Sequence, residues 1–286
     1  MRAVRVLHEN RLEKPAVAIT LADETRQAFD SVAPDYHRSN LENRVLRGMR
    51  QRTIAAVLRH ALSPSHLLDL GCGPGTDAES LAALGHTITA VDASARMVDE
   101  ARRRVHESGL ADRVAVHQLG LDALDALPAA GADMAYSNFG PLNCVEDLGA
   151  TAGAIARRLR AGGIFIASVI GRVCPWEIAL YASRGDLERI RVRFARGVVA
   201  VPLNGHVVRT RYYMPRAFER SFARAGFRRV SLRALGLFAP PPYLQAFAER
   251  HPALVHVLER ADDATGSWPV LRNAGDHFLM VLRKAM

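Results

Sequence analysis

The sequence predicts an α/β fold in which a mostly parallel sheet carries helices on both faces. Between residues 65 and 171, apolar runs of strand length alternate with amphipathic segments of helical period. Such alternation is typical of parallel sheets, because each crossover helix returns the chain to the same end of the sheet. The chain has 286 residues, 49% hydrophobic and 23% charged, so it is long enough to bury a full core.

The predicted elements follow one another in a regular order. A helical region comes first, over residues 23–61. It consists of the stretch "DETRQAFDSVAPDYHRS" and then "ENRVLRGMRQRTIAAVLRHAL", and Pro34 punctuates its period. Strands are then predicted at 65–70, 87–93, 113–120, 132–139 and 164–171, with intervening helices at 75–85, 94–109 and 148–163. Ser94 is the expected N-cap of the second of these helices, and Gly85 and Gly109 are the expected stops.

The pattern changes after Gly171. Helical segments are predicted at 174–197, 215–227 and 239–267, a hairpin at 198–214 around Asn204-Gly205, and a final strand at 276–284. We therefore expect one integrated domain in four parts. These are an N-terminal arm and helical cap (1–60, with residues 1–20 a mobile arm), a core (61–171), an insertion or substrate lid that includes returning core elements (172–270), and the last strand (271–286).

The stretch "LLDLGCGPGTD" at residues 67–77 places three glycines at alternate positions directly after a strand. Glycines in such a turn let backbone N–H groups approach a ligand at the carboxyl end of the sheet. Thr76 stands where the dinucleotide fingerprint has its last glycine, and no Walker lysine is present. Asp92 ends the next strand, where a carboxylate can accept both hydroxyls of a ribose. Several nucleoside-containing ligands fit these residues.

Four stretches together resemble the class I S-adenosylmethionine (SAM)-dependent methyltransferases in order and spacing: "LLDLGCGPGTD", "ITAVDASARMVDEAR", "YSNFGPLN" and "LRAGGIFIASV". The resemblance covers about residues 60–170 and extends more weakly to either side. It implies a Rossmann-like, mostly parallel seven-stranded sheet with an N-terminal helical cap and a helical and hairpin insertion before the last strands. It also implies SAM as cofactor and methyltransferase activity.

The resemblance further implies a role for each matching residue. The methionine part of SAM would be held by Asp69 and the backbone of Gly71, Cys72, Gly73 and Gly75. Asp92 would hold the ribose, and Ala93 and Met97 would flank the adenine. The adenine amino group would meet Asp122, or Leu121 if the register differs by one residue. Ser137, Asn138 and Phe139 would face the sulfonium and the acceptor.

Methyl transfer from a sulfonium is an in-line displacement, so the protein mainly aligns the reactants and needs a base only for a protonated nucleophile. The candidates for a titratable group at the mouth of the site are Tyr36, His206, His277 and Glu177. Three aromatic residues could line an acceptor pocket or flank the sulfonium by cation–π attraction: Phe139, Trp176 and Tyr212.

Three classes of acceptor chemistry stay open. A small molecule methylated on O or N, in secondary metabolism or envelope tailoring, is favoured by the predicted insertion. Nucleic acid is suggested by the net charge of +9 and the pI of about 10.2, but "SNFG" replaces the Asn/Asp-Pro-Pro-aromatic stretch of base-amino methyltransferases. Non-methylating SAM chemistry, such as cyclisation or lyase chemistry, is compatible with the same cofactor motifs.

The remaining expectations concern metals, location and assembly. The three cysteines, Cys72, Cys144 and Cys174, have no zinc or disulfide spacing, and no metal site is predicted. The apolar runs are too short to span a membrane, and the N-terminus lacks the apolar region of a signal peptide. We therefore expect a cytoplasmic protein that acts as a monomer or homodimer.

Overall fold

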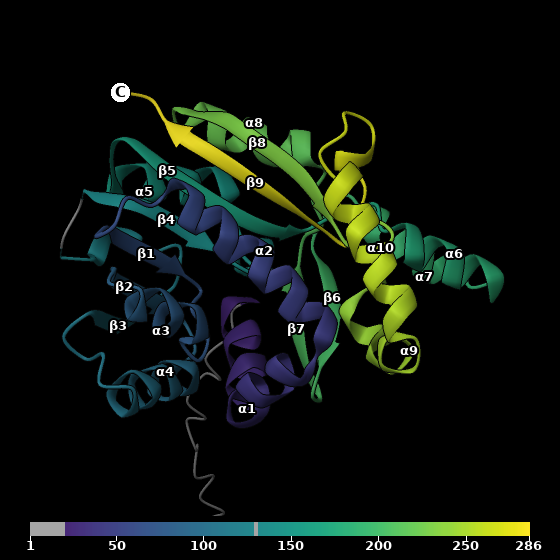
Figure 1. Cartoon of the computed structure of the whole chain (residues 1–286), viewed down its shortest axis with the longest axis horizontal. Helices are drawn as coiled ribbons and strands as arrows, with labels where there is room; N and C mark the ends of the chain where they lie inside the picture. Colours follow the sequence, from purple (N-terminus) through teal and green to yellow (C-terminus); the bar gives the residue numbers. More distant parts are fainter. Residues whose placement is uncertain (1–20, 129–130) are drawn as a thin grey trace, which may run out of the picture.

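The structure is a computed structural model that describes residues 21–128 and 131–286, so the expectation for residues 1–20 lies outside it. Its centre is a seven-stranded sheet of order β3-β2-β1-β4-β5-β9-β8 (Figure 1). Among the described strands of this sheet, β9 runs antiparallel to the other six. The strands are β1 His66–Leu70, β2 Thr87–Asp92, β3 Val114–Gln118, β4 Ala132–Ser137, β5 Leu159–Ile170, β8 Phe227–Leu235 and β9 His277–Lys284. The predicted α/β class and mostly parallel seven-stranded sheet are confirmed.

Helices bury their apolar stripes on both faces of this sheet. One face carries α5 (Leu148–Arg158) and α8 (Pro215–Arg224), where Phe222 stacks on Phe165 at 5.0 Å between ring centroids. The other face carries α2 (Arg44–His60), α3 (Thr76–Ala83) and α4 (Ala95–Glu107). Single 3-10 turns lie in the connections: η1 Leu124–Ala126, η2 Pro141–Asn143, η3 Pro242–Leu244 and η4 Leu271–Asn273.

The sequence prediction was wrong at two places in the helices. The two predicted helical stretches are the helices α1 (Leu21–Glu42) and α2, which meet at Asn43, but Pro34 lies inside α1 and does not interrupt it. The Asn43 side chain caps α2 by accepting the Leu46 N–H, and a side-chain cap of this kind starts a new helix. The helix predicted over 148–163 ends at Arg158, because Leu159 already pairs with β4 and Gly162 has a left-handed φ of 71°.

Two inserted segments interrupt the core after β5. The first holds α6 (Pro175–Ser183), α7 (Leu187–Phe194) and a separate antiparallel hairpin of β6 (Val199–Leu203) and β7 (His206–Thr210). The predicted Asn204-Gly205 turn is confirmed, with φ values of 47° and 77°. The second insert, between β8 and β9, holds α9 (Gln245–Arg250) and α10 (Pro252–Thr265). The core elements α8 and β8 lie between the two inserts.

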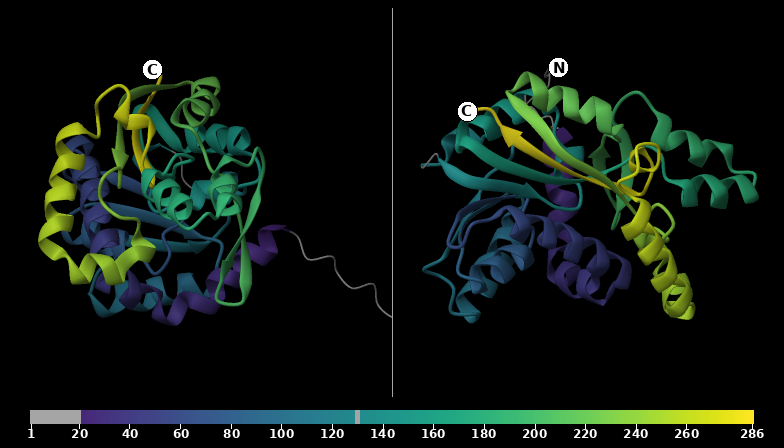
Figure 2. Two further views of the ribbon diagram at one scale, coloured as in Figure 1. Left: turned by 90° about the vertical axis from the view of Figure 1, so that its right-hand side faces the viewer. Right: turned by 45° about the horizontal axis from the view of Figure 1, so that its top comes forward.

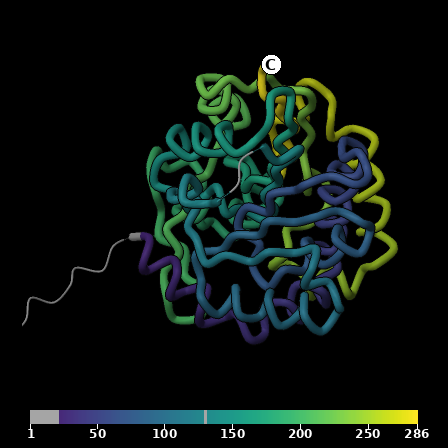
Figure 3. The backbone as a smooth tube through the Cα atoms, turned by 90° about the vertical axis from the view of Figure 1, so that its left-hand side faces the viewer, coloured from purple at the N-terminus to yellow at the C-terminus, as the bar shows by residue number. Residues whose placement is uncertain are grey.

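Both inserts pack on the N-terminal helices. The β6–β7 hairpin lies against α1, where the Arg209 N–H donates to Thr25 Oγ1 at 3.2 Å and its guanidinium pairs with Glu24 at 2.8 Å. α10 lies beside α2 (Figure 3). The Arg52–Asp263 ion pair, at 2.7 Å, links the two helices. The result is that α1 is held across the carboxyl ends of the parallel strands. Over residues 21–128 and 131–286, no helix is long and apolar enough to cross a membrane.

Candidate functional site

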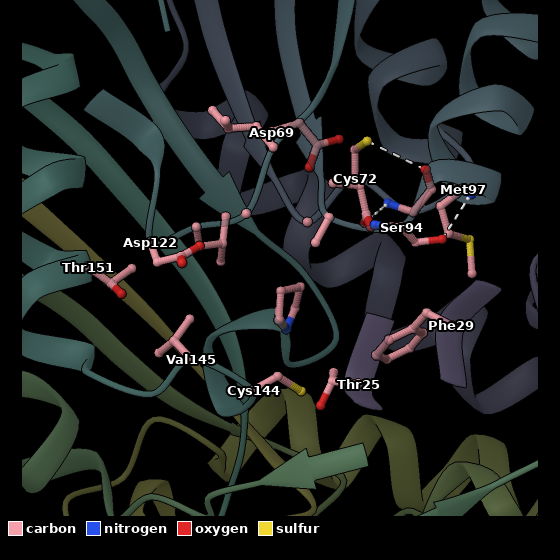
Figure 4. A pocket seen from close by; sticks show the side chains of 18 of the residues that line it. Thr25, Phe29, Asp69, Cys72, Ser94, Met97, Asp122, Cys144, Val145 and Thr151 are labelled. Atoms are coloured by element: carbon pink, nitrogen blue, oxygen red, sulfur yellow. Dashed lines mark hydrogen bonds between the residues drawn. The ribbon is translucent and has the colours of Figure 1, made fainter. Parts of the chain in front are cut away.

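A cavity of about 610 Å³ opens where the parallel strands end, beneath α1 (Figure 4). Its floor comes from the loops after β1, β2, β3 and β4, and its opposite wall from Thr25, Phe29 and Tyr36 of α1. Eleven of the residues predicted to bind cofactor line it: Asp69, Gly71, Cys72, Gly73, Asp92, Ala93, Met97, Leu121, Asp122, Asn138 and Phe139. The topology therefore brings together residues that are up to 70 positions apart in the chain.

The glycine loop is drawn tightly against the neighbouring strand. The N–H groups of Gly71 and Cys72 both donate to the Val91 carbonyl at 2.9 Å. Gly71 has φ 78°, and a Cβ atom there would stand 2.4 Å from Pro141 Cγ. Only glycine fits this close approach, and it leaves the loop backbone open toward the cavity.

Asp92 is fixed by backbone donors at the end of β2. Its two carboxylate oxygens accept the N–H groups of Gly73 and Ser94, each at 2.9 Å. Ser94 then caps α4 by accepting the Met97 N–H at 3.1 Å, which confirms the predicted N-cap. Burial raises the pKa of Asp92, while the amide hydrogen bonds from Ser94 and Gly73 oppose the rise. The carboxylate is thus held in one orientation at the cavity wall.

A cluster of polar groups surrounds Asp77 at the base of α3. Arg50 of α2 forms an ion pair with Asp77, and the Asn138 amide donates to the same carboxylate at 2.9 Å. The pKa of the neighbouring Asp69 lies well above its usual range because of burial first and the Asp77 charge second. Tyr136 O–H donates to Asp69 at 2.8 Å. Asn138 Oδ1 and Arg50 Nε are buried without a hydrogen-bond partner among the described residues.

Two residues predicted to bind cofactor lie outside the cavity lining. Gly75, with φ 74°, lets α3 approach α4, since a Cβ there would be 3.0 Å from Ala101 Cβ. Ser137 is fully buried and donates to the Leu70 carbonyl at 2.8 Å, which ties β4 to β1. Both positions shape the loops that line the cavity.

Phe139 follows β4 in a conformation uncommon for a bulky residue, with φ 59°. The Arg50 guanidinium lies 4.8 Å from its ring centroid on one side. The His277 ring meets it edge-on, with centroids 6.3 Å apart. The strained backbone is therefore supported by ring contacts from α2 and β9, and the residue borders the cavity.

The structure separates the predicted acid–base candidates. Tyr36 lines the cavity, and burial raises the pKa of its phenol. His206 is exposed at the hairpin turn, and His277 is buried with Nδ1 2.9 Å from Asp276 Oδ2. Glu177 is bound by Arg193. Among the described residues that line the cavity there is no histidine.

The three aromatic candidates for an acceptor pocket are also separated. Phe139 borders the cavity, whereas Trp176 donates from Nε1 to the Phe238 carbonyl at 2.5 Å in the insert. The Arg193 guanidinium lies 5.2 Å from the Tyr212 ring centroid. Among the described residues, Arg157 is the last one along the chain that lines the cavity. The predicted lid region 172–270 therefore does not border the cavity.

Three side chains at the insert could in principle form a cation site. Ligand atoms of Cys174, Glu177 and Asp276 lie within 4.8 Å of one another. Arg193, however, donates to Glu177 at 2.8 Å and to Asp276 at 2.6 Å, so a guanidinium already supplies the positive charge there. Burial raises the pKa of the Cys174 thiol to about 12, so it carries no charge at neutral pH.

Apart from Tyr36, which the sequence analysis placed at the site, the residues that the N-terminal helices contribute were missed. Thr25 and Phe29 of α1 and Arg50 of α2 line the cavity, as do Asp77 and Cys144. Asp77 stands in the same stretch as the glycines, so its position next to the loop was a usable signal. Cys144 follows β4 in the loop that carries Phe139, so its place also follows from the strand order. The three helical residues carry no local signal, because their place depends on how helices pack across the sheet.

The fold and the site define a class of protein, and comparison with known proteins agrees. Residues 67–163 match a family described as a methyltransferase domain. The chain therefore carries a class I SAM-dependent methyltransferase domain, a family that implies SAM as cosubstrate.

Individual relatives match parts of the chain. It is 30% identical to a ubiquinone biosynthesis O-methyltransferase of Aromatoleum aromaticum over 51% of this chain and 62% of that protein. It is 32% identical to a malonyl-[acyl-carrier protein] O-methyltransferase of Enterobacter lignolyticus over 48% of this chain and 49% of that protein. The chain thus spans less than two thirds of the length of these curated relatives.

Solved structures share the fold over nearly the whole chain. The [4+2]-cyclase SpnF aligns with a TM-score of 0.63 at 18% identity, covering 93% of this chain and 97% of that one. The CcbJ methyltransferase from Streptomyces caelestis aligns with a TM-score of 0.60 at 18% identity, covering 92% and 100%. At this identity the likeness concerns the fold alone.

Proposed function

We propose that this chain is a SAM-dependent methyltransferase that transfers a methyl group to an O or N atom of a small-molecule acceptor. One observation carries the proposal: a single cavity joins the glycine loop and Asp92 to a chamber walled by α1. The region of the glycine loop and Asp92 suits a nucleoside with an amino-acid tail. The chamber walled by α1 leaves room for the methyl acceptor. SAM supplies an activated methyl group when bound, so the protein's task is to align and desolvate.

The unpaired polar groups of the cavity fit SAM. Asp92 would accept the ribose hydroxyls, since two backbone amides already orient its oxygens. Within residues 21–128 and 131–286, Asn138 Oδ1 has no donor and Arg50 Nε has no acceptor. These two groups would complement the α-ammonium and the α-carboxylate of the methionine part, and burying them without a ligand costs free energy.

The side of the cavity formed by α1 and the loop after β4 offers uncharged side chains to an acceptor. Thr25 and Phe29 lie there with Cys144 and Val145 (Figure 4). Burial raises the pKa of Cys144 to about 12, so this thiol is neutral. No described lining residue is a histidine that could act as a general base. The acceptor would therefore bring a nucleophile that is already ionised or has a free lone pair. Phenolates, enolates, carboxylates and unprotonated amines meet this condition.

The printed names of two relatives are consistent with an oxygen acceptor. Both the Aromatoleum aromaticum and the Enterobacter lignolyticus proteins are described as O-methyltransferases. Methylation of a small oxygen nucleophile is therefore the form of the proposal to test first.

The test has two stages. Calorimetry should show that SAM and its demethylated product bind; failure of both would remove the cofactor assignment. Radiolabelled SAM is then incubated with panels of phenols, carboxylates and amines, with transfer RNA as a separate arm. Label in the small-molecule arms supports the proposal, and label confined to RNA contradicts it. Breakdown or cyclisation of SAM without any acceptor would instead indicate lyase or cyclase chemistry.

A further inference from the structure

The helical hairpin of α6 and α7 takes no part in the cavity. It projects from the body of the molecule (Figure 2). Among the described residues of α6 none is buried, and in α7 only Arg193 is. In globular proteins most helical stability comes from packing an apolar face. Two helices that bury so little therefore have apolar surface available for contact with something outside the chain.

α7 buries one arginine, Arg193, and exposes apolar side chains next to its other charged residues. Leu187, Ile190 and Phe194 are spaced i, i+3 and i+7 and form one stripe along the helix. Leu187 is 58% exposed and Phe194 is 44% exposed. Arg193, on another side of the helix, is 7% exposed and is held by two carboxylates. A helix on a globular core normally shows the reverse arrangement.

The surroundings of this stripe are basic. Residues 172–198 contain six arginines and three acidic residues, a net charge of +3. Arg184, Arg191 and Arg196 are exposed, and no carboxylate within the described residues pairs with them. Exposed leucine and phenylalanine beside arginines form the pattern of helices that lie at the surface of anionic bilayers.

The charge also decides between the possible occupants. In a symmetric dimer the same patch would meet itself, and two faces of net positive charge would repel. An anionic lipid surface offers hydrocarbon for the apolar stripe and negative charge for the arginines at the same time. An anionic membrane is therefore the occupant that best matches both the apolar stripe and the arginines.

We propose that this surface, the α6–α7 face, docks the protein peripherally on an anionic membrane. It consists of Leu187, Ile190 and Phe194 with Arg184, Arg191 and Arg196. The docking goes beyond the proposed methyl transfer and does not depend on it, because the face and the cavity share no residue.

Sedimentation with lipid vesicles tests the proposal on the full chain. Vesicles of phosphatidylcholine alone are compared with vesicles that also contain phosphatidylglycerol. The bound fraction is expected to be about fivefold higher or more on the anionic vesicles and to fall as salt is added, because surface charges are screened. Equal binding to both kinds of vesicle, or none, overturns the proposal.

Two double variants separate the apolar and electrostatic contributions. Leu187→Ser with Phe194→Ser removes the stripe, and Arg191→Glu with Arg196→Glu reverses the charge. Each is expected to reduce binding to anionic vesicles to near the level of phosphatidylcholine alone. Because these side chains are exposed, melting temperature and SAM affinity should stay unchanged, which distinguishes lost docking from lost folding.

The matched controls are Leu84→Ser and Arg228→Glu, which change exposed residues of the same types elsewhere. They should bind vesicles like the parent chain, and an equal loss in the controls contradicts the proposal. Analytical ultracentrifugation tests whether a second copy of the chain occupies this face instead of a membrane. A dimer that the serine variants dissociate, without vesicle binding by the parent chain, would show a self-interface and overturn membrane docking.

Discussion

Two helices with the same kind of apolar stripe lie in opposite surroundings in this molecule. In α4, Met97, Ala101 and Val105 are buried against the sheet. In α7, the corresponding stripe from Leu187 to Phe194 is largely exposed, and the buried position belongs to an arginine. Periodicity in a sequence shows that a helix has an apolar side, but it does not show what covers that side.

The difference extends to the two halves of the chain. Residues up to Arg157 build the cavity, while the described residues after it build the far part of the sheet, its covering helix and the outer inserts. From this division, we expect substitutions in the inserts to affect stability or docking, and substitutions around the glycine loop to affect ligand binding. The following predictions test it in order of expected effect.

The largest effect is expected from Arg193→Met. The change removes the guanidinium that pairs with the buried carboxylate of Asp276, and breaking a buried ion pair costs about 3–5 kcal/mol of unfolding free energy. Urea unfolding measures the loss. SAM affinity should be unchanged in the fraction that stays folded, since Arg193 does not line the cavity.

Arg189→Met is the matched control on the same helix. Its side chain is 65% exposed and its ion pair with Asp186 spans 3.4 Å in solvent, so the change should lower the free energy of unfolding far less than Arg193→Met does. A similar loss of unfolding free energy in both variants would contradict the view that Arg193 anchors the insert.

The second effect concerns Asp92 and SAM. Asp92→Asn removes the charged acceptor for the ribose hydroxyls and should weaken SAM binding about 100-fold, as loss of charge-assisted hydrogen bonds does. Calorimetry measures the affinity. Asp99→Asn, on an exposed side chain of α4, should leave it unchanged.

Binding should also depend on pH in a defined direction. Only the ionised carboxylate of Asp92 accepts both hydroxyls, and burial raises its pKa. SAM affinity should therefore be full above the pKa of Asp92 and decrease as pH falls through it, beginning at a higher pH than for an exposed aspartate. The Asn variant should lack this decrease; an identical pH profile in both proteins would place the titration elsewhere.

The third effect is local strain at the glycine loop. Gly71→Ala combines a left-handed φ with a Cβ atom 2.4 Å from Pro141. The substitution should lower the free energy of unfolding by about 2 kcal/mol or more. Gly109→Ala has the same sign of φ but nothing within 4 Å of its Cβ, so it should cost about 1 kcal/mol. Thermal unfolding compares the two, and equal losses would argue against the close approach.

The smallest effect is expected for Tyr36→Phe. Burial raises the pKa of this phenol, so it remains protonated and acts at most as a hydrogen-bond donor in the cavity. Loss of one neutral hydrogen bond should reduce SAM affinity or kcat/KM about fivefold. A loss of several orders of magnitude in kcat alone, with a changed pH profile, would instead identify Tyr36 as a general base.

Residues of the site were predictable from sequence where they directly follow a strand. Asp69, Asp92 and Phe139 all stand at or just after the ends of parallel strands, and those ends meet at one edge of the sheet. Arg50 was not predictable, because a helical residue reaches the cavity only if its helix crosses the sheet at one particular angle. The predictions for His206 and His277 rested on loop and strand-end positions, and neither histidine reaches the cavity lining.

By itself the sequence determined the order of strands and helices, the glycine turn and the family of the cofactor-binding domain, because these depend on neighbours in the chain. Only the tertiary structure decided that α1 walls the cavity, that the inserts lie outside it and that α7 shows its apolar stripe to the surroundings. Those features depend on contacts between segments far apart in sequence, such as Arg209 with Glu24 and Arg193 with Asp276. The hydrophobic periodicity of a segment does not indicate which distant segments it contacts.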